Sequence, residues 1–213
     1  MTKTETDGYY GNARAEMLDY VPATAKRVLE FGCGAGVFGA SVKARGAEVW
    51  GVELDPVAAR AATTRLDRVL CADVATAFEQ LPKAAFDCVV FNDVLEHLID
   101  PRTTLTATKA LLAPGGVVTC SIPNVRHFRN LINLLVHKQW RYEDSGVLDR
   151  THLRFFTERS ITEMFDELGY DLRRLECVNG YTSWKYRALG KLSFGFLSDV
   201  FTQQFGCVAA PRA

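Results

Sequence analysis

The sequence predicts an α/β protein with a doubly wound, mostly parallel sheet and helices on both of its faces. Short β-branched and aromatic runs alternate with segments of helical spacing over most of the chain. A glycine-rich loop follows the first of these runs, and acidic or amide side chains follow several of the later ones. Such alternation indicates βαβ units, whose crossover connections keep the strands parallel.

The first part of the chain contains the regular alternation. Buried strands are predicted at residues 27–31, 47–53, 68–72, 86–92 and 116–122. Helical spacing lies between them at residues 37–45, 55–66 and 100–112. The last two helices begin with Asp-Pro, in which the aspartate caps the helix and proline takes its first position. The segment APGGV (113–117) predicts a tight turn that leads into the fifth strand.

The pattern changes after residue 122. A helix and a polar loop are predicted for 123–154, then a helix over 157–169 and strands over 170–178 and 204–210. We expect 123–154 to be a lid inserted after the fifth strand. The apolar stretch 188–201 has the composition of a packed helix, which we prefer to a membrane or partner surface.

We expect one domain, because 213 residues can bury one sizeable core. Its predicted parts are a cofactor-binding core (9–122), the lid (123–154) and a C-terminal helix with strands (155–213), together spanning 1–213. Lys+Arg and Asp+Glu both number 25, so no overall basic field points to nucleic acid. The start of the chain is polar, and no apolar run is long enough to span a membrane.

The six cysteines are scattered and include no C-x-x-C pair, which argues against structural zinc. Most of them lie in or beside apolar runs, where a reduced thiol acts as a small hydrophobic group. A reduced, cytoplasmic protein is therefore expected.

The loop LEFGCGAGVFG (29–39) can be aligned in two frames. From Gly34, the letters G-A-G-V-F-G match the dinucleotide fingerprint of NAD-dependent oxidoreductases. From Glu30, E-F-G-C-G-A-G resembles the acidic glycine loop of S-adenosylmethionine (SAM) methyltransferases. Either frame brings backbone amides close to a ligand at the N-terminus of a helix. In the second frame Gly39, which completes the dinucleotide fingerprint, is incidental.

Other residues favour the second frame. Glu53 closes the second strand and can accept hydrogen bonds from a ribose, which both frames require. Glu30, however, occupies a strand end where dinucleotide-binding strands usually carry an apolar residue. Asp73 follows the third strand, where it can accept from an adenine amino group. The segment FNDVLEHL (91–98) brings further polar groups to the same edge of the sheet.

On these motifs, together with APGG before the fifth strand, the chain resembles the class I SAM-dependent methyltransferases. The resemblance implies a Rossmann-like, seven-stranded sheet with an antiparallel last strand, SAM as cofactor and S-adenosylhomocysteine as product. Tyr10 and Arg14 are similar to residues that close over the methionine end of the cofactor in this family. The other cofactor-binding residues implied are Glu30, Gly32, Cys33, Gly34, Gly36, Glu53, Leu54, Asp73, Val74, Asn92 and Asp93.

Two narrower resemblances concern the methyl acceptor. Residues 149–170 are similar to methyltransferases that accompany glycosyltransferases in surface polysaccharide and O-antigen biosynthesis, whereas the VLEH segment resembles quinone-ring O-methyltransferases. The first match covers more residues, so O-methylation of a small-molecule or glycan hydroxyl is predicted. A quinone or aromatic hydroxyl is the alternative. An NAD-dependent oxidoreductase and a SAM-binding protein without catalysis are the rivals from other classes.

A hydroxyl acceptor needs a base, and histidine is the natural candidate near neutral pH. His97 and His152 are the two candidates, and we prefer His152; both could instead have structural roles. Asp93, Glu96 and His97 form D-x-x-E-H, which resembles a metal cluster of some methyltransferases. A divalent metal is nevertheless not expected, because the first acid is shorter here and no fourth ligand can be assigned.

The predicted lid carries six Lys/Arg residues against three acids. The simpler interpretation is a solvated helix face that caps the core. The functional interpretation is that arginines of the lid meet a phosphate on the acceptor; those considered are Arg126, Arg129, Arg141, Arg150 and Arg154. The expected partner is thus a small molecule or glycan, with or without phosphate, and the pattern leaves the oligomeric state open.

Overall fold

The computed structural model describes residues 13–180 and 192–212. Its strands are β1 (Arg27–Phe31), β2 (Glu48–Glu53), β3 (Arg68–Cys71), β4 (Phe86–Asn92), β5 (Leu112–Pro123), β6 (Tyr170–Gly180) and β7 (Thr202–Pro211). Its helices are η1 (Ala15–Tyr20), α2 (Val37–Lys43), α3 (Pro56–Ala62), α4 (Val74–Ala77), η2 (Leu95–His97), α5 (Pro101–Thr108), α6 (Phe128–Leu135) and α7 (Glu158–Glu167).

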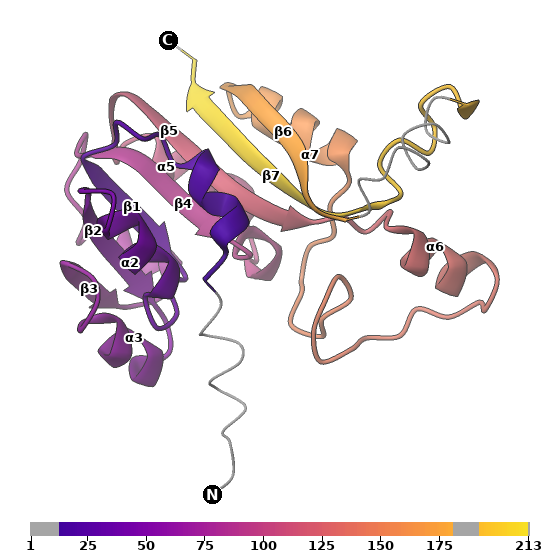
Figure 1. Cartoon of the computed structure of the whole chain (residues 1–213), viewed down its shortest axis with the longest axis horizontal. Helices are drawn as coiled ribbons and strands as arrows, with labels where there is room; N and C mark the ends of the chain where they lie inside the picture. The colour runs from indigo at the N-terminus through magenta and orange to yellow at the C-terminus, as the bar shows by residue number, and fades with distance from the viewer. Residues whose placement is uncertain (1–12, 181–191, 213) are drawn as a thin grey trace, which may run out of the picture.

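The strands form a seven-stranded sheet in the order β3-β2-β1-β4-β5-β7-β6, which runs diagonally across Figure 1. The pairs from β3 to β5 are parallel. Strand β7 lies between β5 and β6 and is antiparallel to both. The predicted fold class and the antiparallel last strand beside the fifth are therefore confirmed.

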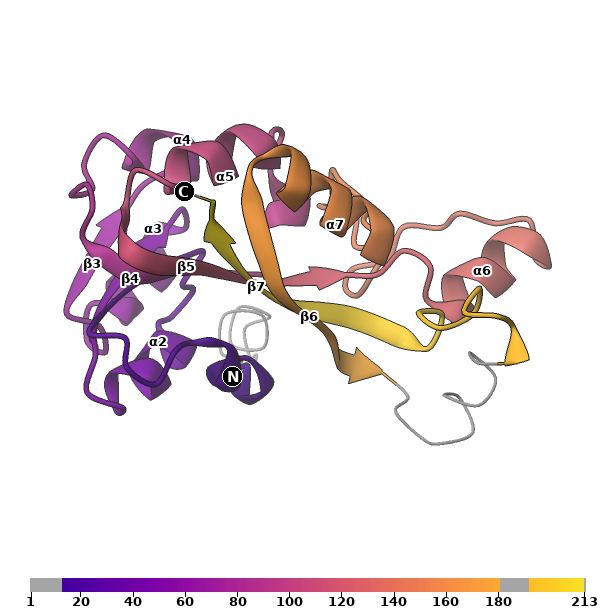
Figure 2. The ribbon, with the colours of Figure 1, turned by 90° about the horizontal axis from the view of Figure 1, so that it is seen from above.

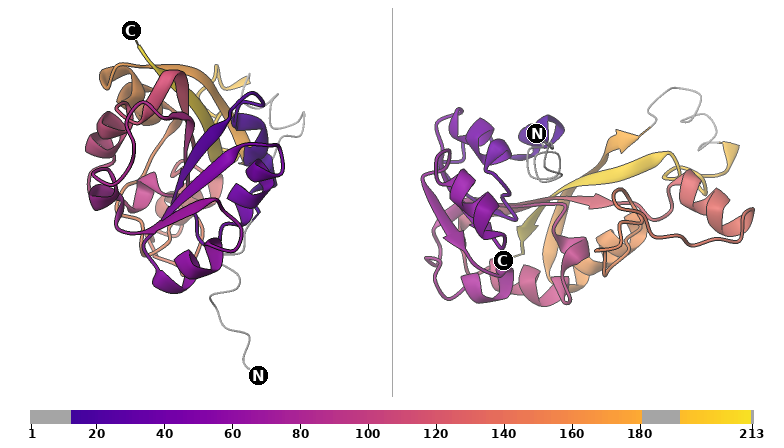
Figure 3. Two further views of the ribbon diagram at one scale, coloured as in Figure 1. Left: turned by 90° about the vertical axis from the view of Figure 1, so that its left-hand side faces the viewer. Right: turned by 90° about the horizontal axis from the view of Figure 1, so that it is seen from below.

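Helices cover both faces of the sheet (Figures 2 and 3). Figure 2 places α5 and α7 on one side of the strands and η1 with α2 on the other. The alternation of β1 explains this arrangement, because Leu29 and Phe31 belong to one buried cluster while Val28 belongs to a second. Each strand near the centre thus supplies side chains to two cores.

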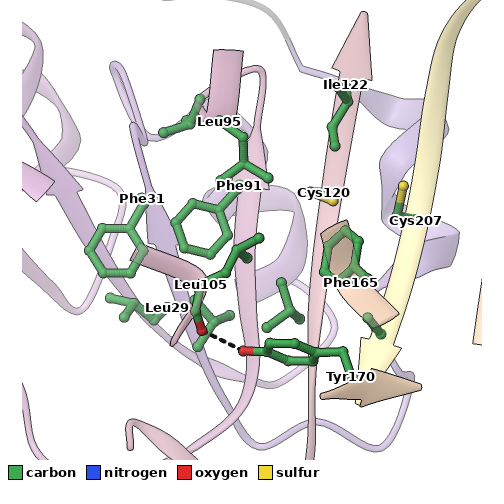
Figure 4. Close-up of a cluster of buried hydrophobic side chains, with 14 of the residues drawn as sticks. Leu29, Phe31, Phe91, Leu95, Leu105, Cys120, Ile122, Phe165, Tyr170 and Cys207 are labelled. Atoms are coloured by element: carbon green, nitrogen blue, oxygen red, sulfur yellow. Dashed lines mark hydrogen bonds between the residues drawn. The ribbon is translucent and has the colours of Figure 1, made fainter. Parts of the chain in front are cut away.

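The larger core lies between the sheet and α5 and α7 (Figure 4). Phe31 and Phe91 stack with ring centroids 5.0 Å apart. The hydroxyl of Tyr170 donates to the carbonyl of Leu105 at 2.7 Å, which satisfies the polar end of a fully buried ring. These contacts join the first strand, the fourth strand and the C-terminal part of the protein into one packed unit.

The region around APGG differs from the prediction. Helix α5 ends at Thr108, and β5 already begins at Leu112. Leu112 pairs with Phe86 and Val117 pairs with Cys88, so the residues between form a bulge within the strand instead of a turn before it. Leu112 is buried in the core, and this burial draws the segment into the sheet.

The apolar stretch near the C-terminus also differs from its prediction. Residues 188–191 lie outside the described part, but Leu192, Phe194 and Phe196 are strongly exposed. The expected packed helix is therefore wrong for 192–196. Across the described residues, none of the helices combines the length and apolar character needed to cross a membrane.

Candidate cofactor and acceptor site

A cavity of about 870 Å³ opens at the carboxyl ends of the parallel strands, where ligands bind in sheets of this type. Most of the predicted cofactor-binding residues line it: Arg14, Glu30, Gly32, Cys33, Gly34, Glu53, Leu54, Asp73, Val74, Asn92 and Asp93. His97 and His152 line it as well. Tyr10 lies outside the described residues. Gly36 is not among the lining residues.

The glycine loop is shaped by positive φ angles and close contacts. Gly32 has φ 65°, and a Cβ there would lie 2.6 Å from Val94 Cγ2. Gly36 has φ 77° and caps α2, with Leu66 and Ala62 about 3.1 to 3.2 Å from the position of a Cβ. Gly36 therefore allows α2 to begin and to pack closely against α3, and it does not line the cavity itself.

Gly39 has a packing role on the first turns of α2. It is buried in α2, and a Cβ at this position would lie 2.7 Å from Leu66 Cδ2 and 3.0 Å from Glu30 Oε2. The third glycine of the apparent dinucleotide fingerprint is required by packing, which is independent of the cofactor.

Glu53 organises the start of the loop from the end of β2. Its carboxylate is buried, and its oxygens accept from Gly34 N at 2.8 Å and Asp55 N at 2.9 Å. Each carboxylate oxygen has a second lone pair, so Glu53 can also accept from ligand hydroxyls at the cavity wall. This arrangement fits the predicted ribose position.

Glu30 is buried beneath the glycine loop. Burial raises the pKa of its carboxyl group to about 8, so the acid is mostly protonated at neutral pH. Its Oε2 has no hydrogen-bond partner among the described residues. Because a nearby ammonium group would stabilise the carboxylate, this side chain suits a cationic ligand group.

Two further predicted positions present polar groups to the cavity. Asp73 caps α4 by accepting from Ala75 N at 2.8 Å, and it lies exposed at the cavity edge. Asn92 ends β4, and within the described part of the chain neither its amide nitrogen nor its amide oxygen has a partner, although both are buried. A ligand could satisfy both atoms of Asn92.

Asp93 is held in a network with Arg14. Its carboxylate accepts from Arg14, from Ser121 and from Gln204, which joins the N-terminal segment to β4, β5 and β7. Burial raises the pKa of Asp93, while the charge of Arg14 opposes this shift. The φ of Asp93 is 54°, a left-handed backbone conformation that residues other than glycine rarely adopt. This network shapes the cavity wall between the two ends of the site.

Two imidazoles form the other end of the cavity. The rings of His97 and His152 meet edge to face with centroids 4.7 Å apart. Nδ1 of His97 lies 3.3 Å from the carbonyl oxygen of Thr151 and 3.2 Å from its hydroxyl. A carbonyl can only accept, so Nδ1 carries the proton and Nε2 has the free lone pair.

A relay continues behind His97. The hydroxyl of Thr151 donates to Asp149 Oδ1 at 2.6 Å. Burial opposes ionisation of Asp149, but hydrogen bonds from Thr151 outweigh it and lower the pKa of this acid. Burial and the neighbouring His152 lower the pKa of His97, which keeps this ring neutral near neutral pH. His97 is thereby oriented as a neutral base.

His152, which the sequence favoured as the base, is more enclosed. Its Nδ1 donates to the carbonyl of Val147 at 3.0 Å, and its Nε2 lies 4.0 Å from Glu96 Oε1. Burial, followed by the charge of Asp93, raises the pKa of Glu96 well above its ordinary value. His152 is thus paired with a buried acid, whereas His97 is only half buried.

Backbone contacts bring the two histidine segments together. The carbonyl of Glu96 accepts from Leu153 N at 2.8 Å and Arg154 N at 3.0 Å. Several lining residues are not among the predicted site residues, and Asp149 is the most informative of them. The Asp-x-Thr spacing of 149–151, typical of a local side-chain turn, is the signal that could have identified it.

Glu96, His97 and His152 could also hold a metal ion, since one ligand atom from each lies within 4.8 Å of the others. Asp93, the first acid of D-x-x-E-H, is engaged by Arg14 and Gln204 instead.

The arginines predicted to meet a phosphate are placed elsewhere. Arg126 pairs with Asp199 and Arg150 pairs with Asp144, and of the five none is among the cavity-lining residues of the described chain. Besides Pro123 at its start, the part of the predicted lid that reaches the cavity is its loop, through Ser145, Gly146, Val147, Asp149 and His152.

A family profile described as a methyltransferase domain matches residues 4–175. An uncharacterized methyltransferase of Mycobacterium bovis is 40% identical over 114 residues, which are 50% of this chain and 57% of that relative. The match therefore spans little more than half of that protein. A ubiquinone biosynthesis O-methyltransferase of Cereibacter sphaeroides is 31% identical over 173 residues, 78% of this chain and 69% of the relative.

Solved structures agree in fold. A SAM-dependent methyltransferase from Archaeoglobus fulgidus superposes with a TM-score of 0.71 at 19% identity, over 96% of this chain and 95% of that one. At this identity the likeness concerns the fold.

Proposed function

This chain belongs to the class I SAM-dependent methyltransferases, and from that premise we propose that it transfers the methyl group of SAM to a hydroxyl of a small-molecule acceptor. The observation that carries the proposal is one cavity with two unlike ends. One end has the glycine loop and Glu53, and the other has an oriented neutral imidazole on His97.

The residues of the first end fit SAM. Buried polar atoms of Glu30 and Asn92 have no partner among the described residues, so a ligand with an ammonium group and polar edges would satisfy them. We assign Glu53 to the ribose, Asp73 to the adenine side, and Glu30 with Asn92 to the methionine end. When bound there, SAM supplies a methyl group on a sulfonium, which is already activated for in-line displacement.

The protein's part in the reaction is alignment and proton removal. Holding both reactants in one cavity replaces a bimolecular encounter by a positioned one, which can supply much of the rate. A hydroxyl near neutral pH is a weak nucleophile, so removing its proton during attack accelerates transfer. His97 Nε2 can take this proton, because Nδ1 is committed to Thr151 and Asp149 lies behind it.

The acceptor class is less closely defined by the residues. The relative from Cereibacter is, by its name, an O-methyltransferase of ubiquinone biosynthesis, which favours an aromatic hydroxyl for this chain too. The glycan hydroxyl preferred from residues 149–170 has no counterpart among the relatives described above, and it stays a prediction. A phosphate on the acceptor gains no support, because the lid arginines lie away from the cavity.

Labelled transfer separates these acceptors. The protein is incubated with methyl-labelled SAM and, in parallel, with catechol-type phenols, nucleotide sugars and primary amines. The proposal predicts label in a hydroxyl-bearing acceptor, with phenols ahead of sugars. Transfer confined to amines would contradict O-methylation, and transfer to sugars alone would restore the glycan prediction.

We propose that proton removal needs no metal ion. Asp93 is engaged by Arg14, so D-x-x-E-H supplies only Glu96 and His97 to the cluster with His152. Turnover should survive thorough chelation followed by assay in chelator. Loss of turnover that returns on adding Mg²⁺ or Mn²⁺ would instead make Glu96, His97 and His152 metal ligands.

A further inference from the structure

Two segments far apart in the sequence expose apolar side chains at the same end of the molecule. Figures 1 and 2 show α6 and the segment from residue 192 to the start of β7 extending beyond the same end of the sheet. They are in contact, because Phe128 N donates to the carbonyl of Val200 at 2.8 Å, and Arg126 donates to the carbonyl of Phe196 at 2.7 Å.

The exposed apolar residues of this tip are large. Leu135 is 72% exposed, Leu192 is 78% exposed and Phe194 is fully exposed. The remaining members are Ile132, Leu134, Val136 and Phe196. We call these seven residues the apolar tip. Exposed groups of this size at one end of the molecule indicate a surface that binds something apolar.

The exposed charges on α6 and just after it are positive, whereas the exposed acid Glu158 lies near Arg126 and Asp199 at the base of the tip. Arg129 and Lys138 are exposed on or just after α6, and no acid occurs between residues 124 and 142. The acid nearest in the second segment, Asp199, is buried and paired with Arg126. The α6 part of the tip therefore combines apolar side chains with the positive charges of Arg129 and Lys138.

We propose that the apolar tip docks on a membrane surface that carries anionic lipid headgroups. Leucine and phenylalanine side chains enter the boundary between headgroups and acyl chains, while lysine and arginine meet the lipid phosphates. A symmetric contact between two copies through this tip would place the cations of one against those of the other, which disfavours that occupant. This proposal is independent of the acceptor's chemistry.

Vesicle sedimentation tests the docking. The full chain is mixed with phosphatidylcholine vesicles, with or without phosphatidylglycerol, and the bound fraction is measured. The wild type should bind the anionic vesicles and bind neutral ones much more weakly. Phe194→Glu should lower the partition coefficient about tenfold or more, and Lys138→Glu about fivefold or more.

Val57→Glu is the matched control, because it places the same acid on an exposed apolar position of α3 outside the tip. It should bind vesicles as the wild type does. Circular dichroism and SAM affinity confirm that all variants are folded. Equal binding of Phe194→Glu and wild type would overturn the proposal. So would a wild type that ignores anionic vesicles while Phe194→Glu converts a dimer to a monomer in analytical ultracentrifugation.

Discussion

The two ends of the cavity are built in different ways. At the cofactor end, Glu53 at the end of β2 accepts from Asp55 N two residues later and from Gly34 N in the glycine loop after the neighbouring strand β1. At the acceptor end, His97 meets Thr151 across 54 positions of sequence. The first end is built at the strand ends of the sheet, whereas the second depends on a loop from a distant part of the chain, so each end can be altered separately by substitution.

Glu53→Ala should have the largest effect, and it should fall on the cofactor end alone. The change removes the acceptor of Gly34 N and Asp55 N together with the assigned ribose contacts. Losing two charge-assisted hydrogen bonds corresponds to about a hundredfold weaker binding or more. Isothermal titration with SAM measures it. Glu48→Ala, at the other end of β2, is the control, and an unchanged affinity in Glu53→Ala would refute the ribose assignment.

Glu30→Gln tests the cofactor end through the pH dependence of the free energy of unfolding. Burial raises the pKa of Glu30 from 4.5 to about 8, so its contribution to stability is full below pH 4.5 and is lost as pH rises toward 8. Glutamine does not titrate. As pH rises across this window, the free energy of unfolding of the ligand-free variant should increase relative to that of the wild type by on the order of 3 kcal/mol.

Urea unfolding at several pH values measures that gain. Glu48→Gln is the matched control, because hydrogen bonds from Trp50 and Arg27 lower the pKa of Glu48, and its effect lies below pH 4.5. Parallel stability curves for wild type and Glu30→Gln would show that Glu30 is ionised without ligand.

Asp149→Asn should have the smallest effect, at the acceptor end. The negative charge of Asp149 raises the pKa of His97, so its removal lowers that pKa further. The acid limb of the pH–rate profile should move to lower pH, and kcat should fall about tenfold as the orientation of Thr151 loosens. Asp144→Asn, at an exposed position, is the control. A shift of the acid limb of the pH–rate profile to higher pH would contradict the proposed relay from His97 through Thr151 to Asp149.

The same contrast explains what the sequence could predict. The strands and the glycine loop that follows the first of them could be predicted from local spacing, whereas the antiparallel last strand was implied by the family resemblance. The packing role of Gly39 could not be predicted, because Leu66, which lies against it, comes after α3 and is distant in the sequence. Leu112 was predicted to end a helix but begins β5, because burial in the core outweighed the turn signal of APGG. The contacts of His152 with Val147 and Glu96 could not be predicted, because they form only after the loop folds over the sheet.

The central claim is that His97 acts on the acceptor while the other end of the cavity holds the cofactor. The direct measurement is kcat with a labelled hydroxyl acceptor for His97→Ala, His152→Ala and the exposed control His137→Ala, alongside SAM affinity. His97→Ala should lower kcat about a hundredfold or more, with SAM affinity unchanged. The wild-type rate should fall only below the ordinary histidine pKa of 6.5. Full turnover by His97→Ala, with the loss in His152→Ala instead, would contradict the account.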